Sequence, residues 1–226
     1  MTVQADLLAM LQHGDSAFPS GAVAFSWGIE TLCAEGRVVG ADDVVSFVAG
    51  QLAGRWADFD RPALAAAHAA AGDLDRVARI DRLLEAQTLS REMREGSRRA
   101  GGALLTVHDG MGTPGANEYR RRVSEGAAPG HAAAVQGLLW RGAGVEQEAI
   151  GAMAAHAFAT GLLGAALRLG LIGHVDGQRI LAGLRPLVAG ILATPPPPVE
   201  DICSFTPEAE IAVLRHETAD ARLFAT

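Results

Sequence analysis

Apolar residues recur at the spacing of an α-helix along almost the whole chain, with polar residues between them. No stretch combines a strand-like alternation with β-branched or aromatic enrichment. The pattern therefore predicts an all-α fold, a single compact multi-helix domain of about nine to ten helices with a C-terminal arm. To within about 2 to 4 residues at each boundary, we expect helices at residues 5–13, 22–35, 42–57, 61–71, 74–88, 90–107, 131–142, 146–170 and 176–193.

Residues that start and stop helices agree with these ranges. Ser90 and Asp73 each precede a periodic segment and are good N-caps, and Gly36 is a C-terminal stop. Two segments interrupt the pattern, the glycine-rich "HDGMGTPGANE" and the four prolines at residues 195–198, which predict a stiff extended spacer. We accordingly divide the chain into a helical domain, 1–194, and a partner-binding arm, 195–226.

The arm begins its helical part at Pro207. Proline fits the first turn of a helix, and Glu208 and Glu210 favour the positive end of the helix dipole. Leu223 and Phe224 lie near the end of the chain, where apolar residues often anchor a terminal segment. We expect this arm to be part helical, part extended and docked, and to become ordered against a partner.

Residues 149–167 contain nineteen consecutive positions without a formal charge, close to the length that spans a bilayer. The run is rich in alanine and glycine, includes His156 and Thr160, and has no neighbouring basic cluster. We interpret it as a central buried helix that crosses its neighbours closely at four small residues, Gly151, Ala155, Gly161 and Gly164.

The formal net charge of −7 argues against nucleic acid or an anionic membrane as the partner, because both attract basic surfaces. All nineteen basic residues are arginine, so the chain has neither a P-loop lysine nor a Schiff-base lysine. A bound nucleotide would therefore belong to a partner protein.

No set of residues predicts catalysis, a cofactor or a metal. The seven histidines have no pair at helical spacing for a metal, and Cys33 and Cys203 are far apart in sequence and read as free thiols. His108 with Asp109 lacks the third group of a triad. Together with an N-terminus unlike a signal peptide, these features predict a cytoplasmic, non-enzymatic protein.

Two segments remain as candidate interaction surfaces. The turn at Pro19 to Gly21 feeds a helix on which Phe25, Ile29 and Leu32 share a face, which fits either simple packing or recognition of another protein. The helix "SREMREGSRRAGGALL" carries four arginines and two glutamates. It is either a solvated face with ion pairs along it or a surface for an acidic partner or a phosphate.

Taken together, these segments resemble the urease accessory protein UreF family. The resemblance rests on "LLAMLQHGDSAFPSGAVAFSWGIETLCAEGRV", "SREMREGSRRAGGALL", "HAAAVQGLLWRGAGV", "AAHAFATGLLGAALRLGLIGHVDGQRIL" and "LRHETADARLF", which follow in the family's order over most of the chain. Three features depart from the family pattern: Ala22 replaces a turn glycine, "VAFS" precedes the helix, and the chain ends in Ala-Thr.

The resemblance implies a dimeric helical scaffold that works with UreD (also called UreH) and the GTPase UreG to deliver nickel to apo-urease. It also implies partner-binding residues in the N-terminal turn and helix, the arginine helix, the last core helix and the arm. They are Pro19, Gly21, Ser26, Gly28, Glu30, Arg91, Glu92, Arg94, Gly177, Gln178, Arg179, Arg215, His216, Glu217, Thr218, Arg222, Leu223 and Phe224.

On this interpretation, deletion of residues 207–226 leaves the core folded and abolishes partner binding. The alternative is a regulator of UreG, in which Arg91 or Arg94 acts as an arginine finger or fidelity check. A hydrolase is disfavoured, because no nucleophile, base and orienting group occur together.

Overall fold

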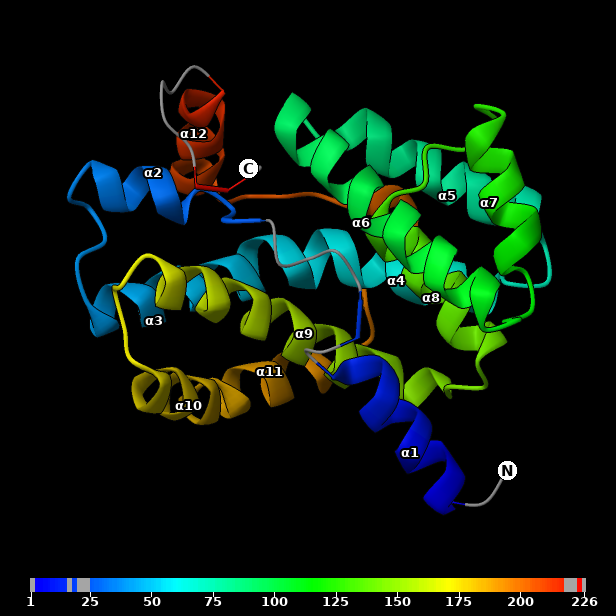
Figure 1. The fold of residues 1–226 in the computed structure, drawn as a ribbon, viewed down its shortest axis with the longest axis horizontal. Helices are drawn as coiled ribbons and strands as arrows, with labels where there is room; N and C mark the ends of the chain where they lie inside the picture. The colour runs from blue at the N-terminus through cyan, green and yellow to red at the C-terminus, as the bar shows by residue number, and fades with distance from the viewer. Residues whose placement is uncertain (1–2, 16–17, 20–24, 218–222, 225–226) are drawn as a thin grey trace.

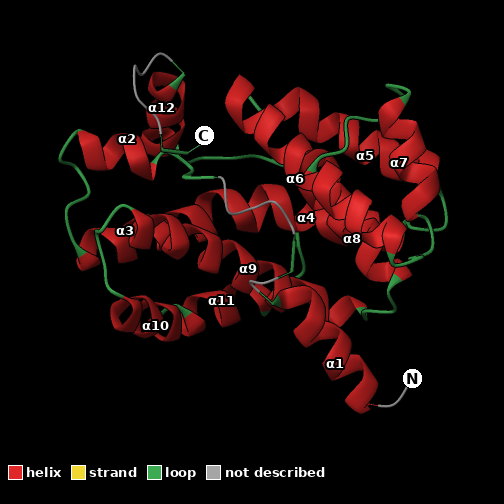
Figure 2. Ribbon diagram, viewed as in Figure 1, coloured by secondary structure: helices red, strands yellow, loops and turns green. Residues whose placement is uncertain are grey.

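The computed structural model describes residues 3–15, 18–19, 25–217 and 223–224, except for the side chains of residues 3–6. Helices joined by short loops make up this part of the chain, and it contains no strand (Figure 2). The all-α prediction is confirmed. The elements are α1 (Val3–Gly14), α2 (Ile29–Ala34), α3 (Ala41–Gln51), the π-helix η2 (Leu52–Asp60), α4 (Arg61–Ala69), α5 (Leu74–Gln87), α6 (Arg91–Gly110), α7 (Ala116–Ser124), α8 (Ala132–Gly142), α9 (Gln147–Arg168), α10 (His174–Gly183), α11 (Arg185–Leu192), the 3₁₀ turn η3 (Val199–Asp201) and α12 (Pro207–His216).

Two apolar clusters form the core. One surrounds α9 and includes residues of α2, α3 and α10, whereas the other joins α4, α5, α6, α7 and α8. In Figure 1 the second cluster occupies the end of the molecule with α5 and α7, and α12 lies at the other end beside α2. Helices α4 and α8 approach so closely that a Cβ atom at Gly137 would lie 2.4 Å from the Leu64 carbonyl oxygen. Glycine at this position therefore allows the two backbones to pack together.

The segment before α2 differs from the sequence prediction. A helix was expected over 22–35, but α2 begins at Ile29, because Trp27 and Gly28 have φ angles of 54° and 89° in the left-handed region. Phe25 thus precedes the helix and does not share a helical face with Ile29 and Leu32. Its ring instead occupies the space beside Gly96 of α6. All three apolar side chains are nevertheless buried.

Three other helix predictions need correction. The range 42–57 is divided into α3 and η2, and the range 176–193 is divided into α10 and α11, with Pro186 in the first turn of α11. The sequence prediction missed α7, because Ala116 and Tyr119 are its only buried residues and the glycines before it resemble an interruption.

The long helix α9 contributes to the core, as predicted. Only half of its most apolar window is buried, however, so the helix is not buried along its whole length. It is the one described helix long and apolar enough to cross a membrane, and core helices of soluble proteins meet the same criterion. Its close crossing is confirmed at Gly151, where a Cβ atom would lie 2.7 Å from Leu192. A Cβ atom added at Gly161 or Gly164 would have no described neighbour within 4 Å, so close crossing is not confirmed there.

The π-helix η2 positions the arm. Its backbone leaves the carbonyl oxygens of Asp58 and Gly54 to accept hydrogen bonds from the Cys203 and Phe205 amides, at 3.1 and 2.8 Å. A Cβ atom at residue 54 would lie 2.6 Å from the Phe205 carbonyl oxygen, so glycine allows this approach. The segment after η3 therefore runs along η2 and delivers the chain to α12, whose predicted start at Pro207 is confirmed.

A cluster of three rings packs the end of α1 against α6. The His13 and His108 ring centroids are 5.0 Å apart, and the Phe18 centroid lies 5.2 Å from the first and 5.4 Å from the second. Burial lowers the pKa of His13, and burial followed by the charge of His13 lowers the pKa of His108 to about 4. The two imidazoles are therefore uncharged at neutral pH.

This cluster predicts a loss of stability in mild acid. An unfolded histidine takes up a proton near pH 6.5, whereas His108 in the folded chain does so only near pH 4. The unfolded state binds more protons between these values, so the free energy of unfolding falls as the pH drops through this window. We expect His13→Phe to reduce this pH dependence, measured by urea denaturation at several pH values between 7 and 4.5. An unchanged dependence in the variant would contradict the role of the pair.

Candidate functional site

The structure brings together three of the candidate residues from distant parts of the sequence: Glu30 of α2, Glu92 of α6 and His216 of α12. His216 Nδ1 lies 2.8 Å from Glu92 Oε2, and His216 Nε2 lies 3.1 Å from Glu30 Oε2. The imidazole is 2% exposed, and the Glu92 and Glu30 side chains are 6% and 15% exposed. The site is thus a buried contact in which one imidazole joins three helices.

The geometry also indicates how hydrogen is distributed in this contact. An ionised carboxylate accepts hydrogen bonds and cannot donate them. Both contacts can therefore form with ionised glutamates only when both ring nitrogens carry hydrogen. The imidazole thus contacts both carboxyl groups and separates them.

Glu30 also fixes the end of the chain. Its Oε1 accepts a hydrogen bond from the Leu223 amide at 2.6 Å, and its Oε2 accepts one from the Phe224 amide at 3.1 Å. The Phe224 side chain is buried in the α9 cluster, with the Arg168 guanidinium 4.4 Å above its ring. Within the described residues the arm packs on the core of its own chain, whereas the sequence analysis expected a partner to order it.

The residues beside His216 make further contacts between the arm and the core. Glu217 Oε1 accepts hydrogen bonds from the Ser90 hydroxyl at 3.3 Å and the Glu92 amide at 3.4 Å. This carboxylate lies at the positive N-terminal end of α6, where negative charge is favourable. On the surface, Arg215 forms a 3.0 Å ion pair with Glu35.

Gly28 allows α2 and α12 to approach each other. A Cβ atom there would lie 2.7 Å from the Ala209 carbonyl oxygen, and the φ angle is positive. Both constraints favour glycine. Ser26 is fully buried two residues earlier, whereas Pro19 is exposed. Gly21, Thr218 and Arg222 lie outside the described residues.

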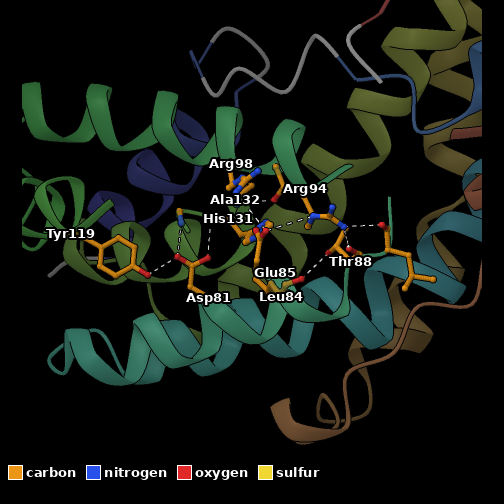
Figure 3. A network of polar contacts seen from close by, with 12 residues as sticks. Asp81, Leu84, Glu85, Thr88, Arg94, Arg98, Tyr119, His131 and Ala132 are labelled. Carbon is orange, nitrogen blue, oxygen red and sulfur yellow. Dashed lines mark hydrogen bonds and ion pairs between the residues drawn. The ribbon is translucent and has the colours of Figure 1, made fainter. Parts of the chain in front are cut away.

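The arginines of α6 have different environments. Arg94 donates from Nη1 to the carbonyl oxygens of Thr88 and Leu89, both at 2.7 Å, and lies toward Glu85 (Figure 3). Arg91 is 63% exposed, and its nearest carboxylate oxygen, on Glu217, is 3.9 Å away. Arg91 is therefore free to reach a partner, and Arg94 is held by its own chain.

The candidates on α10 lie apart from the arm. Figure 1 places α10 at the lower edge and α12 at the upper edge, with α3 and α9 between them. Gly177 is buried and Gln178 is exposed. The Arg179 side chain is 76% exposed and lies 3.3 Å from Asp176. The structure does not bring this group together with the His216 contact.

Sequence reasoning missed the outward face of α12. Ile211 and Leu214 are 47% and 50% exposed, while the opposite face of the helix buries Ala212 and Val213. Leu223 is also exposed, at 65%. The spacing of Ile211 and Leu214, three residues apart, is the signal that could have identified this face.

A second buried polar network, shown in Figure 3, joins α5, α7 and α8. Asp81 accepts hydrogen bonds from the Tyr119 hydroxyl at 2.8 Å and from the amides of Gly130 and His131 at 2.6 and 2.8 Å. Burial raises the Asp81 pKa despite these donors. His131 Nε2 is 2.7 Å from Glu85 Oε2. Both carboxylate oxygens of Asp81 already accept hydrogen bonds from the backbone before α8. We therefore interpret this network as structural.

Comparisons with known proteins agree with the resemblance seen in the sequence. The family model described as UreF matches residues 38–185. The chain is 30% identical over 225 residues to the urease accessory protein UreF of Trichodesmium erythraeum, covering 96% of each chain. It is 33% identical over 224 residues to that of Cereibacter sphaeroides, covering 97% of this chain and 98% of the relative. The corresponding protein of Kocuria rhizophila is 32% identical over 230 residues, with 97% of each chain covered.

The buried contact predicts a large stability difference between two neighbouring substitutions. His216→Ala leaves Glu30 and Glu92 without the imidazole between them, and a buried polar group that loses its hydrogen-bond partner costs about 1 to 3 kcal/mol. Arg215→Ala is the matched control, because an exposed ion pair contributes about 0 to 1 kcal/mol. Urea denaturation measures both free energies of unfolding. Equal decreases in the free energy of unfolding would show that the buried contact stabilises the fold no more than the exposed ion pair does.

Proposed function

Because the chain belongs to the urease accessory protein UreF family, we propose that it is a non-enzymatic scaffold for urease maturation. In this proposal it acts as a chaperone in the cytoplasm, as a homodimer, and assembles with UreD (UreH) and the GTPase UreG on apo-urease. The assembly enables insertion of nickel into the urease active site. The family membership supports the proposal, and the absence of a lysine for a P-loop is consistent with leaving GTP hydrolysis to a partner.

We further propose that the arm, 195–226, binds UreD, and this proposal rests on the outward face of α12. A helix whose inner face is fixed by the His216 contact presents Ile211 and Leu214 to solvent without further folding. Leu223 adds a third exposed apolar side chain close to Glu30. Rigid apolar side chains of this kind lose little entropy on binding and are suited to the centre of an interface.

Deletion of residues 207–226 is a poor test of this proposal. It would remove Ala209, Ala212 and Val213, which are buried against the core, together with the exposed face. Loss of binding by the truncated chain would then reflect either lost packing or a lost docking surface. A substitution confined to the exposed face separates the two causes.

We expect Leu214→Glu to weaken binding to the cognate UreD-type protein at least ten-fold, because it places a charge in the apolar centre of the interface. Met111→Glu is the matched control, since Met111 is 47% exposed and Leu214 is 50% exposed, and Met111 follows α6. Both proteins should melt like the original chain. Size-exclusion chromatography with light scattering, followed by titration, measures complex formation. Equal binding by the two variants contradicts the docking face, and no complex with the original chain contradicts the proposed function.

The exposure of Arg91 favours a second candidate function, regulation of the UreG GTPase. Its guanidinium is accessible at the start of α6, whereas that of Arg94 is held by two backbone carbonyls. An arginine finger accelerates GTP hydrolysis by about 10³ to 10⁵. On this hypothesis Arg91→Ala removes the acceleration and the Arg99→Ala control retains it. A GTPase whose turnover is unchanged by the original chain excludes this function.

A further inference from the structure

A cavity of about 340 Å³ lies between α3 and the beginning of α12, beside the loop that joins α2 to α3. Its lining includes Leu32, Val38, Phe47, Gln51, Phe205 and Glu208. Ligand pockets in proteins have volumes of about 300 to 1,000 Å³, so this cavity is at the small end of that range. Its volume suits one large side chain of another molecule better than a whole cofactor.

Gln51 gives the cavity a polar group without a partner. It follows Val44 and Val48 on the buried face of α3 and is only 3% exposed. Its side-chain amide makes no hydrogen bond within the part of the chain that the structure describes. Because the amide atoms are not fully enclosed either, they open onto the cavity that the residue lines. Amides buried to this extent normally have a hydrogen-bond partner, which a ligand in the cavity would supply.

The chemistry of this amide favours a peptide as the ligand. A glutamine side chain offers an oxygen that accepts hydrogen bonds and an NH₂ group that donates them. A backbone peptide group offers the matching pair, one N–H and one C=O. An extended peptide segment therefore satisfies Gln51, whereas a purely apolar molecule would not.

An exposed aromatic ring on the arm completes the apolar part of the site. Phe205 lines the cavity and is 78% exposed, although its backbone is fixed by the 2.8 Å hydrogen bond to the Gly54 carbonyl oxygen. Phe47 of α3 lines the same cavity and is half-buried. Aromatic side chains on a fixed backbone contribute contact area at a low cost in entropy.

The rim of the cavity carries an excess of negative charge. Asp43 and Glu208 contribute two carboxylates and Arg37 one guanidinium. Arg37 Nη2 lies 2.5 Å from Glu208 Oε1, and both side chains are about half exposed. Asp43 forms no ion pair with the described residues, and its Oδ2 accepts a hydrogen bond from the Val39 amide at 2.9 Å. A basic residue in the ligand complements this charge.

We propose that the cavity binds a linear segment of a partner protein, with one large apolar side chain inside and a basic residue at the rim. The Gln51 amide pairs with a backbone peptide group of this segment, and Phe205 contacts its apolar side chain. Neither Ile211 nor Leu214 lines the cavity, so the site is separate from the docking face proposed for UreD. The inference goes beyond the proposed function and does not rest on it.

The site also connects ligand binding to the position of the arm. One wall of the cavity consists of residues 205–209, at the start of α12, and the opposite wall belongs to α3. A segment that contacts both walls binds only the chain with a docked arm. Such a ligand therefore stabilises the docked arrangement by mass action.

The test is an NMR titration of the isotope-labelled full-length chain with the blocked tripeptide acetyl-Ala-Phe-Arg-amide at neutral pH. We expect the side-chain NH₂ signals of Gln51 to shift in a saturable manner, with a Kd on the order of 1 mM for so small a ligand. The matched peptide acetyl-Ala-Ala-Arg-amide should bind about ten-fold more weakly or worse, because it buries no phenylalanine side chain. The peptide acetyl-Ala-Phe-Glu-amide should also bind more weakly, because the rim repels its charge.

Gly50→Leu is the informative variant, because it fills the cavity without a clash. Gly50 lines the cavity, and a Cβ atom there would have no neighbour within 4 Å. Leucine favours a helix more than glycine does, so the variant should melt no lower than the original chain. Gly102→Leu is the matched control, since Gly102 lies within α6 and is equally open. We expect at least ten-fold weaker peptide binding by Gly50→Leu and unchanged binding by Gly102→Leu.

Three results overturn the proposal. If the Gln51 signals do not shift in a saturable manner, or if the phenylalanine and alanine peptides bind equally, the cavity holds water only. If Gly50→Leu binds the peptide as well as Gly102→Leu does, the peptide binds elsewhere. A change of the Gln51 signals on dilution of the protein alone assigns the cavity to a second copy of this chain. None of these results bears on UreD binding, which the Leu214→Glu comparison tests separately.

Discussion

The imidazole of His216 is the contact on which the arrangement of the arm depends. It lies between Glu92, on the long helix α6, and Glu30, on the short helix α2. Without it, the two carboxyl groups would lose a hydrogen-bond partner in a nearly dry space, where such a loss is costly. Because Glu30 also accepts hydrogen bonds from the Leu223 and Phe224 amides, the same contact helps to hold the backbone of these two residues. One ionisable ring thus couples the position of α12 to that of the terminal residues.

The two faces of α12 differ in their contacts: the inner face packs on the core, and the outer face is exposed. The inner face has small side chains, and Gly28 allows α2 to approach them. The outer face has larger apolar side chains that contact little of the described chain. A partner that binds the outer face meets a surface already held in shape, so little of the binding free energy is spent on ordering it.

The sequence predicted the fold class and most of the helices, because apolar residues recur clearly along α5, α6 and α9 and the caps at Asp73 and Ser90 are strong. It failed at α2, where the left-handed conformation of Trp27 depends on surrounding packing and not on local preference. It failed at α7, whose polar sequence gives almost no periodic signal. The residues of the His216 contact were found through the family resemblance, but their mutual contact was not foreseen.

The histidine pair shows a different limit of sequence reasoning. Helical spacing relates only residues that lie three or four positions apart on one helix. His13 and His108 come from α1 and α6, and only the tertiary fold brings their rings together. The same holds for Asp81, whose hydrogen-bond donors lie about forty to fifty residues further along the chain.

The π-helix η2 has a consequence for which changes in chain length the protein can accept. A π-helix has hydrogen bonds from residue i to i+5, so removing one residue from η2 would move it toward an α-helix and change which carbonyl oxygens are left for the Cys203 and Phe205 amides. Arg61, just beyond η2, donates from Nη1 to the carbonyl oxygens of Ile191 and Thr194 at 2.8 and 3.0 Å. A deletion in η2 would therefore shift the carbonyls that hold the segment before α12, next to the residue that holds α11. The number of residues between α3 and α4 is thus constrained by the contacts of η2 with the arm and by those of Arg61 with the end of α11.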